Sequence, residues 1–169
     1  MAQSESYVID IQGFKTLLNE FVMKEVCIVG VHSGKVYHIF VKSPVCYENL
    51  CEKLKSRVNY ITKYIHGIYW NSGSVDENTV VEILQKTVKN ASRVYIKGSE
   101  RVKFLKNLLN NTIPVVDLDI FNFNGNYKIK QANFSCYYNE RHSNLRCALK
   151  NACTYKRWLL NHLEKISCI

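Results

Sequence analysis

The chain has 169 residues, of which 47% are hydrophobic and only two are prolines. No proline-, glycine- or serine-rich stretch divides it, so residues 1–169 predict a single domain with a core over about residues 7–166, and extensive disorder is excluded. The formal net charge of +9, from 23 basic and 14 acidic residues, favours a polyanionic partner. Nucleic acid is the first expectation, and a merely solubilising surface is the alternative.

The first residues, MAQSESYVIDIQGF, contain no basic stretch followed by a long apolar one, and no later segment approaches ~18 consecutive apolar residues. We therefore expect no membrane association and a cytoplasmic and/or nuclear protein. The seven cysteines are better explained as reduced thiols, in the core or at a metal, than as a disulfide framework.

Three apolar runs open the sequence and predict three strands, over residues 7–11, 24–31 and 36–41. The Ser33-Gly34 turn between the last two is typical of a β-hairpin. Asp10 lies at the end of the first strand. We expect these strands to form an antiparallel meander.

The apolar spacing then changes to three or four residues, which predicts a core-facing helix over residues 47–64. Asp76 and Ser99 are each expected to cap a further helix. The polar, aromatic and asparagine-rich residues 120–134 predict a loop, and residues 145–166 predict a closing helix.

Two more strands are predicted, at residues 93–97 and 114–118. The complete order, βββ-α-α-β-α-β-loop-α, predicts an α/β protein with a mixed sheet and helices on both faces. It is the order of an RNase H-like fold, in which α/β crossovers add parallel strands to an antiparallel meander.

Near the end of the chain, Cys136, His142 and Cys147 lie within a dozen residues. Cysteine thiolates and imidazoles are zinc ligands, so this cluster predicts a zinc site whose fourth ligand lies far away in the sequence. The alternative is two buried thiols beside a surface histidine. Cys153 with His162 is another possible ligand pair.

The element order, Asp10 at the end of the first strand and the late motif RCALKNA resemble the DEDD 3′-to-5′ exonuclease branch of the RNase H-like fold. Those enzymes bind two divalent metals through several acids, beginning with an Asp-x-Glu on the first strand. Here Gln12 replaces the glutamate, and Arg146 and Asn151 stand where the family has His and Asp. The resemblance therefore implies a catalytically degenerate member. Asp10 can equally be a polar strand-end residue.

The passage KEVCIVG, YHIFV and Ser43-Pro44 resembles the second and third strands of the Maelstrom domain, an RNA-binding module of the germline small-RNA pathway. The likeness extends from Tyr7 to about Trp158. It implies a structural Zn²⁺ and protein partners of an RNA-silencing pathway. Five residues separate the Cys and the His here, against two in the family pattern. The implied zinc ligands are Glu25, Cys136, His142 and Cys147.

The function we expect is that of a single-stranded RNA-binding module in small-RNA or transposon silencing. Cations for phosphates and rings for unstacked bases are the combination that single strands require. The residues expected to contact RNA are Lys97, Arg101, Lys103, Lys128, Lys130, Tyr137, Tyr138, Arg141, Arg146 and Lys150.

Two alternatives remain. One is an active single-stranded RNA nuclease with a non-standard site, for which Asp10, His38 and His66 are the first candidates because histidines exchange protons near neutral pH. The other is a protein-interaction scaffold that contacts its partner through the tyrosine-rich loop.

Overall fold

The computed structural model describes residues 4–123, 136, 138, 142 and 144–166. Its five strands form one sheet in the order β3-β2-β1-β4-β5. The first three strands are antiparallel, β4 pairs in parallel with β1, and β5 pairs in parallel with β4. The predicted meander with parallel extensions is therefore confirmed. The strands are β1 (Ser6–Lys15), β2 (Phe21–Gly30), β3 (Val36–Phe40), β4 (Arg93–Ile96) and β5 (Val115–Asp117).

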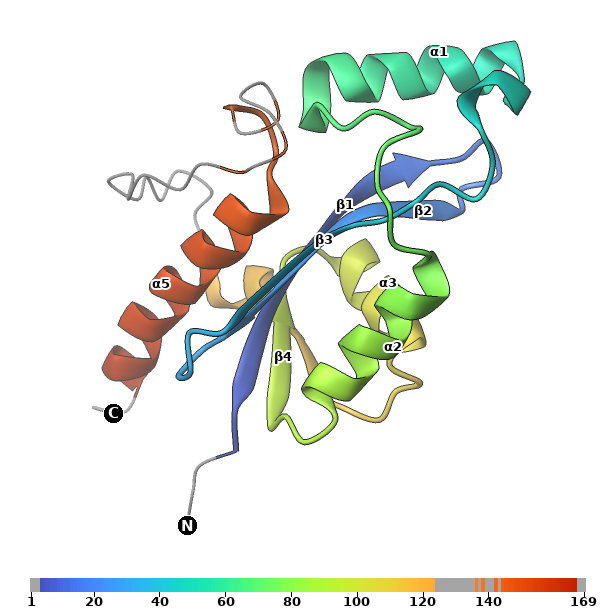
Figure 1. Cartoon of the computed structure of the whole chain (residues 1–169). Coiled ribbons are helices and arrows are strands. Elements are labelled where there is room, and N and C mark those ends of the chain that lie inside the picture. The colour runs from blue at the N-terminus through green and yellow to red at the C-terminus, as the bar shows by residue number, and fades with distance from the viewer. Residues whose placement is uncertain (1–3, 124–135, 137, 139–141, 143, 167–169) are drawn as a thin grey trace.

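Helices cover both faces of the sheet (Figure 1). Helices α2 (Glu77–Val88) and α3 (Ser99–Leu108) pack on one face, where Ile9 and Ile11 contribute to the core. Helix α5 (Ala148–Ile166) packs on the other face, against Val8 and its neighbours. The two faces receive alternate residues of β1 because successive side chains of a strand point in opposite directions.

Helix α1 (Glu52–Ile61) lies beside the far end of the β1–β2 hairpin (Figure 1). Its Val58 packs with Phe14 of β1 and with Trp70, which follows the helix. The helix therefore extends the domain beyond the edge of the α5 face. Within the described part of the chain, no helix is both long enough and apolar enough to cross a lipid bilayer.

A β-bulge in the β1–β2 pair sets the residues of the α5 face. Gln12 pairs with Glu25 and Gly13 with Met23, so Lys24 has no partner in the register. A side chain at Gly13 would collide with the backbone of β2, since a Cβ there would lie 2.1 Å from the Val22 carbonyl oxygen. The pairing places Gln12 and Glu25 on the same face.

Several predicted boundaries differ from the structure. The single helix over residues 47–64 is instead a 3₁₀ turn (Tyr47–Asn49), α1, and a π-helical turn (Thr62–His66). Extended backbone at Leu50 and Cys51 separates the first two pieces, and Gly67 ends the last at φ 70°. The closing helix begins at Ala148, later than the predicted residue 145.

The predicted helix caps also differ. Ser99 is the first residue of α3, and the cap position belongs to Gly98, whose φ of 100° favours glycine. Asp76 occupies the cap position of α2 but its side chain makes no capping hydrogen bond. The start of the loop predicted over residues 120–134 belongs to a 3₁₀ turn (Leu118–Phe121). Residues 124–134 of that loop lie outside the described residues.

Candidate metal centre and basic cleft

Four possible metal ligands from distant parts of the sequence meet on the α5 face. Glu25 comes from β2, His38 from β3, and Cys136 and Cys147 from the approach to α5. One ligand atom from each lies within 4.8 Å of the other three. The strand register brings the first two together, because His38 pairs with Cys27, two residues from Glu25. This cluster can hold a metal ion.

His142 adjoins this cluster as a fifth donor. Its Nε2 lies 3.1 Å from Glu25 Oε1, the same oxygen that lies 2.7 Å from His38 Nε2. Its Nδ1–H donates to the backbone carbonyl of His66, which leaves Nε2 facing the cluster. Of the four ligands implied by the sequence, Glu25, Cys136 and Cys147 are in the mutually close set. His38 completes that set, and His142 lies beside it.

The protein surroundings hold the Glu25 carboxylate in place. Its side chain is fully buried, and its Oε2 accepts a 3.0 Å hydrogen bond from the backbone N–H of Ala148 at the start of α5. Burial raises the pKa of Glu25, but hydrogen bonds from His142 and His38 outweigh burial and lower it overall. The carboxylate is therefore charged, as a metal ligand must be.

The remaining donors are electrostatically coupled. A hydrogen bond from the Cys147 thiol lowers the pKa of Cys136 and raises that of Cys147 itself. Burial lowers the pKa of His142, but hydrogen bonds with Cys136 and Glu25 outweigh it and raise the value to about 10. Two anionic donors, Glu25 and Cys136, thus face one imidazolium, and a divalent ion with a neutral imidazole would neutralise both negative charges.

The donors have the chemistry that a soft or borderline metal requires. Carboxylate, imidazole and thiolate are all zinc ligands. The Ala148 N–H and the His66 carbonyl orient Glu25 and His142 in the way that outer partners commonly orient metal ligands. The six cysteines in the described part of the chain are free thiols. Of the other suggested pair, Cys153 packs into the core, while the ring of His162 stacks on Trp158.

A second polar network surrounds Asp10, farther along the same face. The buried carboxylate lies 3.2 Å from an Arg101 guanidinium nitrogen and accepts hydrogen bonds from Gln12 Nε2 at 2.7 Å and Asn151 Nδ2 at 2.9 Å. Burial raises the pKa of Asp10 to about 6, although Arg101 opposes this shift. One cation and two neutral amides therefore surround the single acid.

The three residues considered for catalysis belong to separate networks. Asp10 is bound to Arg101, and His38 is bound to Glu25. His66 is buried; its Nε2–H donates to the Gly13 carbonyl, and its Nδ1 accepts from the Ile68 N–H. Burial lowers the pKa of His66 to about 4. The backbone thus occupies both ring nitrogens of a neutral imidazole.

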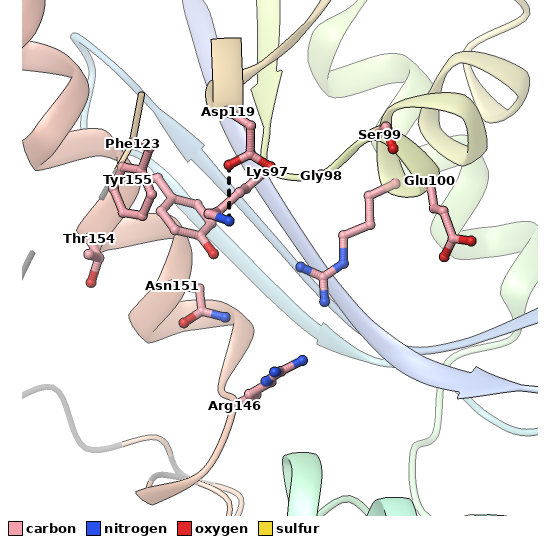
Figure 2. Close-up of a pocket in the computed structure, with 11 residues that line it drawn as sticks. Lys97, Gly98, Ser99, Glu100, Asp119, Phe123, Arg146, Asn151, Thr154 and Tyr155 are labelled. Atoms are coloured by element: carbon pink, nitrogen blue, oxygen red, sulfur yellow. Dashed lines mark ion pairs between the residues drawn. The ribbon is translucent and has the colours of Figure 1, made fainter. Parts of the chain in front are cut away.

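A cleft of about 710 Å³ opens beside the Asp10 network. Lys97 and Arg146 enter it from opposite sides (Figure 2), and Arg101 also lines it. Lys97 is ion-paired with Asp119 at 3.0 Å. Among the residues that the structure describes, no carboxylate pairs with the exposed Arg146. Cations from three segments therefore share one concave surface.

The other residues expected to contact RNA have different positions. Lys103 lines an adjoining cavity, whereas Lys150 lies on α5 and lines neither cavity. The Tyr138 ring stacks on Phe40 at 4.6 Å, and its hydroxyl accepts a hydrogen bond from the Tyr69 N–H. One face of this ring is thus already used in packing. Four predicted contacts lie outside the described residues: Lys128, Lys130, Tyr137 and Arg141.

No family model matches the chain, and no curated protein matches it.

Proposed function

We propose that this protein is a single-stranded RNA-binding module on a catalytically degenerate, RNase H-like fold with a structural zinc site. The observation that carries the proposal is the replacement of an acidic centre by a basic one. Asp10 is bound by Arg101, and the two carboxylates in the lining of the cleft, Asp119 and Glu100, are paired with Lys97 and Lys15. Arg146 adds a cation that no described carboxylate neutralises. Such a surface repels divalent cations and attracts phosphates.

The sheet supports the RNase H-like part of the proposal. An antiparallel β3-β2-β1 meander is extended in parallel by β4 and β5, which is the arrangement that the resemblance to DEDD exonucleases implies. Asp10 and Gln12 lie on β1 within the Asp10 network, with Asn151 contributed by α5. The positions of the family's acids thus correspond to a hydrogen-bonded network containing one acid.

The zinc site would stabilise the fold by joining α5 to the sheet. Glu25, Cys136 and Cys147 would hold the ion, with His38 or His142 as the fourth ligand; the close set favours His38. A bound ion stabilises the native state because the ligands converge only when the chain is folded. The likeness to the Maelstrom domain supports the same role and an association with small-RNA silencing.

The RNA-binding proposal is tested by titrating a fluorescent single-stranded oligoribonucleotide at several salt concentrations. Phosphate contacts predict that affinity falls steeply as salt rises, because binding releases counterions. Binding of single strands that is insensitive to salt, or its complete absence, would contradict the proposal. The absence of binding would favour a protein-interaction scaffold.

The same preparation tests for nuclease activity. We expect the labelled RNA to remain intact in the presence of Mg²⁺, Mn²⁺ or EDTA, since Asp10 is paired with Arg101. Cleavage that copurifies with the protein and disappears in the Asp10→Asn variant would show instead that this network is catalytic.

A further inference from the structure

The basic cleft continues into a second cavity. The second cavity has a volume of about 500 Å³ and shares Glu100, Arg101 and Arg146 with the cleft. The two spaces therefore adjoin and are together called the groove. Both arginines lie at the boundary, beside Glu100, whose carboxylate is paired with Lys15 at 3.0 Å. One end lies beside α5, and the other lies near the end of α1, where Ile61 contributes to the lining.

The two halves of this groove differ in chemistry. The cleft half is lined mainly by polar groups, among them the amide of Asn151, the hydroxyl of Thr154 and the ion pair of Lys97 with Asp119. Two aromatic rings, those of Phe123 and Tyr155, also line it. The other half has an apolar wall, with Lys15 and Lys103 also in its lining. Its apolar residues come from β2, the end of α1, the π-helical turn that follows α1, and α3: Phe21, Ile61, Ile65 and Phe104.

Arg101 and Arg146 are suited to hold an anion at the boundary. Arg101 is fixed by its 3.2 Å contact with Asp10, and 29% of its side chain is exposed. The Arg146 backbone N–H donates to the Ile65 carbonyl, so Arg146 is attached to the wall of the apolar half. Guanidinium groups bind phosphate oxygens through paired hydrogen bonds.

We propose that the groove holds one nucleotide unit of the RNA, with a backbone phosphate at Arg101 and Arg146 and the adjoining base in the apolar half. This inference rests on the proposed RNA-binding function. An apolar wall next to a phosphate site accepts a base only if that base is unpaired, because paired bases are stacked inside the duplex. The groove thereby selects single strands over duplexes.

Two kinds of variant test the base position and the phosphate position separately. Ile65→Asn changes the apolar half and leaves the charge unchanged; Ile65 is only half-buried and belongs to none of the core clusters. Arg146→Gln removes a cation at the boundary. The control for Ile65→Asn is Ile120→Asn, because Ile120 is 67% exposed and lies outside the groove. The control for Arg146→Gln is Arg93→Gln, because Arg93 lies at the end of β4 opposite the cleft.

Affinities are measured by fluorescence anisotropy for two probes, a single-stranded oligoribonucleotide and inorganic polyphosphate, which has no bases. Arg146→Gln should weaken both probes about tenfold, and Ile65→Asn should weaken only the RNA, by about five- to tenfold. The controls should bind both probes like the unmodified chain, and thermal unfolding verifies that every variant is folded.

The outcomes distinguish the two proposals. If single-stranded RNA binds, Arg146→Gln weakens it and Ile65→Asn does not, the base position is wrong while RNA binding stands. Equal losses for RNA and polyphosphate in Ile65→Asn also overturn the base position. If the unmodified chain binds no single-stranded RNA, the proposed function fails first. If duplex RNA binds as tightly as a single strand, the selection argument is wrong.

Discussion

The guanidinium of Arg101 lies 3.2 Å from the carboxylate of Asp10, and these residues come from α3 and β1, 91 positions apart. The Asp10 side chain is fully buried, so its charge acts mainly on the arginine and on the groove above it. Asp10, the acid of this network, is therefore paired with Arg101, a cation of the protein itself.

Replacing Asp10 by Asn should strengthen RNA binding. The change removes a negative charge beneath Arg101 and retains a side chain of the same shape, so we expect affinity for single-stranded RNA to rise about two- to fivefold. Anisotropy titration measures this. Asp76→Asn is the matched control, because Asp76 is exposed at the start of α2 and lines neither half of the groove. A loss of affinity in Asp10→Asn alone would contradict this prediction and would show that Asp10 is needed to position Arg101.

The same variant should change the pH dependence of stability. The pKa of Asp10 is raised to about 6 in the folded chain, so folding strengthens its proton binding. Its contribution to the free energy of unfolding therefore increases as pH falls from about 6 to 4. The groups that contact it are the Arg101 guanidinium and the amides of Asn151 and Gln12, and the Glu25 carboxylate acts on it from farther away. Urea unfolding of both proteins from pH 4 to 6.5 should show the unmodified chain gaining stability relative to Asp10→Asn, and a constant difference would contradict the assignment.

Metal removal should destabilise the fold. We expect purified protein to contain about one zinc per chain and chelation to lower the midpoint of thermal unfolding by about 5–10 °C, since a metal bound only to the native state stabilises it. Cys147→Ala should reproduce this loss and make the protein insensitive to chelator. Cys51→Ala, at an exposed cysteine, should not. Substoichiometric metal in freshly purified protein would remove the basis for a structural site.

The two histidines at the cluster can be separated by substitution. His38 belongs to the mutually close set of donors, so His38→Ala should lower the zinc content measured by elemental analysis. His142→Ala should keep more metal, although it loses the hydrogen bond to the His66 carbonyl. The exposed His32 provides the control, His32→Ala. Metal loss confined to His142→Ala would assign the fourth ligand to His142, as the family resemblance implies.

The sequence predicted the sheet better than it predicted the site. Apolar runs indicated the meander and the later strands, because a buried strand consists largely of apolar residues that are adjacent in the sequence. The role of His38 depends on which residue of β2 it faces, Cys27 in this hairpin, and that register is not visible in either strand alone. Arg101 appeared as one basic residue among many. Only the packing of α3 beside β1 makes it the partner of Asp10.

Local rules also failed where tertiary structure imposed a different conformation. Serine is a favoured helix cap, yet the backbone leaving β4 adopts a positive φ at Gly98, whose N–H donates to Asp117 on β5. The helix consequently begins at Ser99. The constraint comes from the pairing of β4 with β5, which lies about 20 residues farther along the chain. The residue preferences near Ser99 could therefore not predict it.

The placement of α5 has a consequence for how the protein is made. Within the described part of the chain, the strands and the helices of one face are complete once residue 117 has been synthesised. The helix that packs on Val8, Cys27 and Val29 of the other face, α5, follows only with residues 148–166. A nascent chain on the ribosome therefore exposes an apolar sheet surface for as long as it takes to translate that interval. Glu25 likewise lacks Cys147 as a neighbouring donor until synthesis reaches the start of α5, so metal loading on the full ligand set would follow synthesis of the sheet.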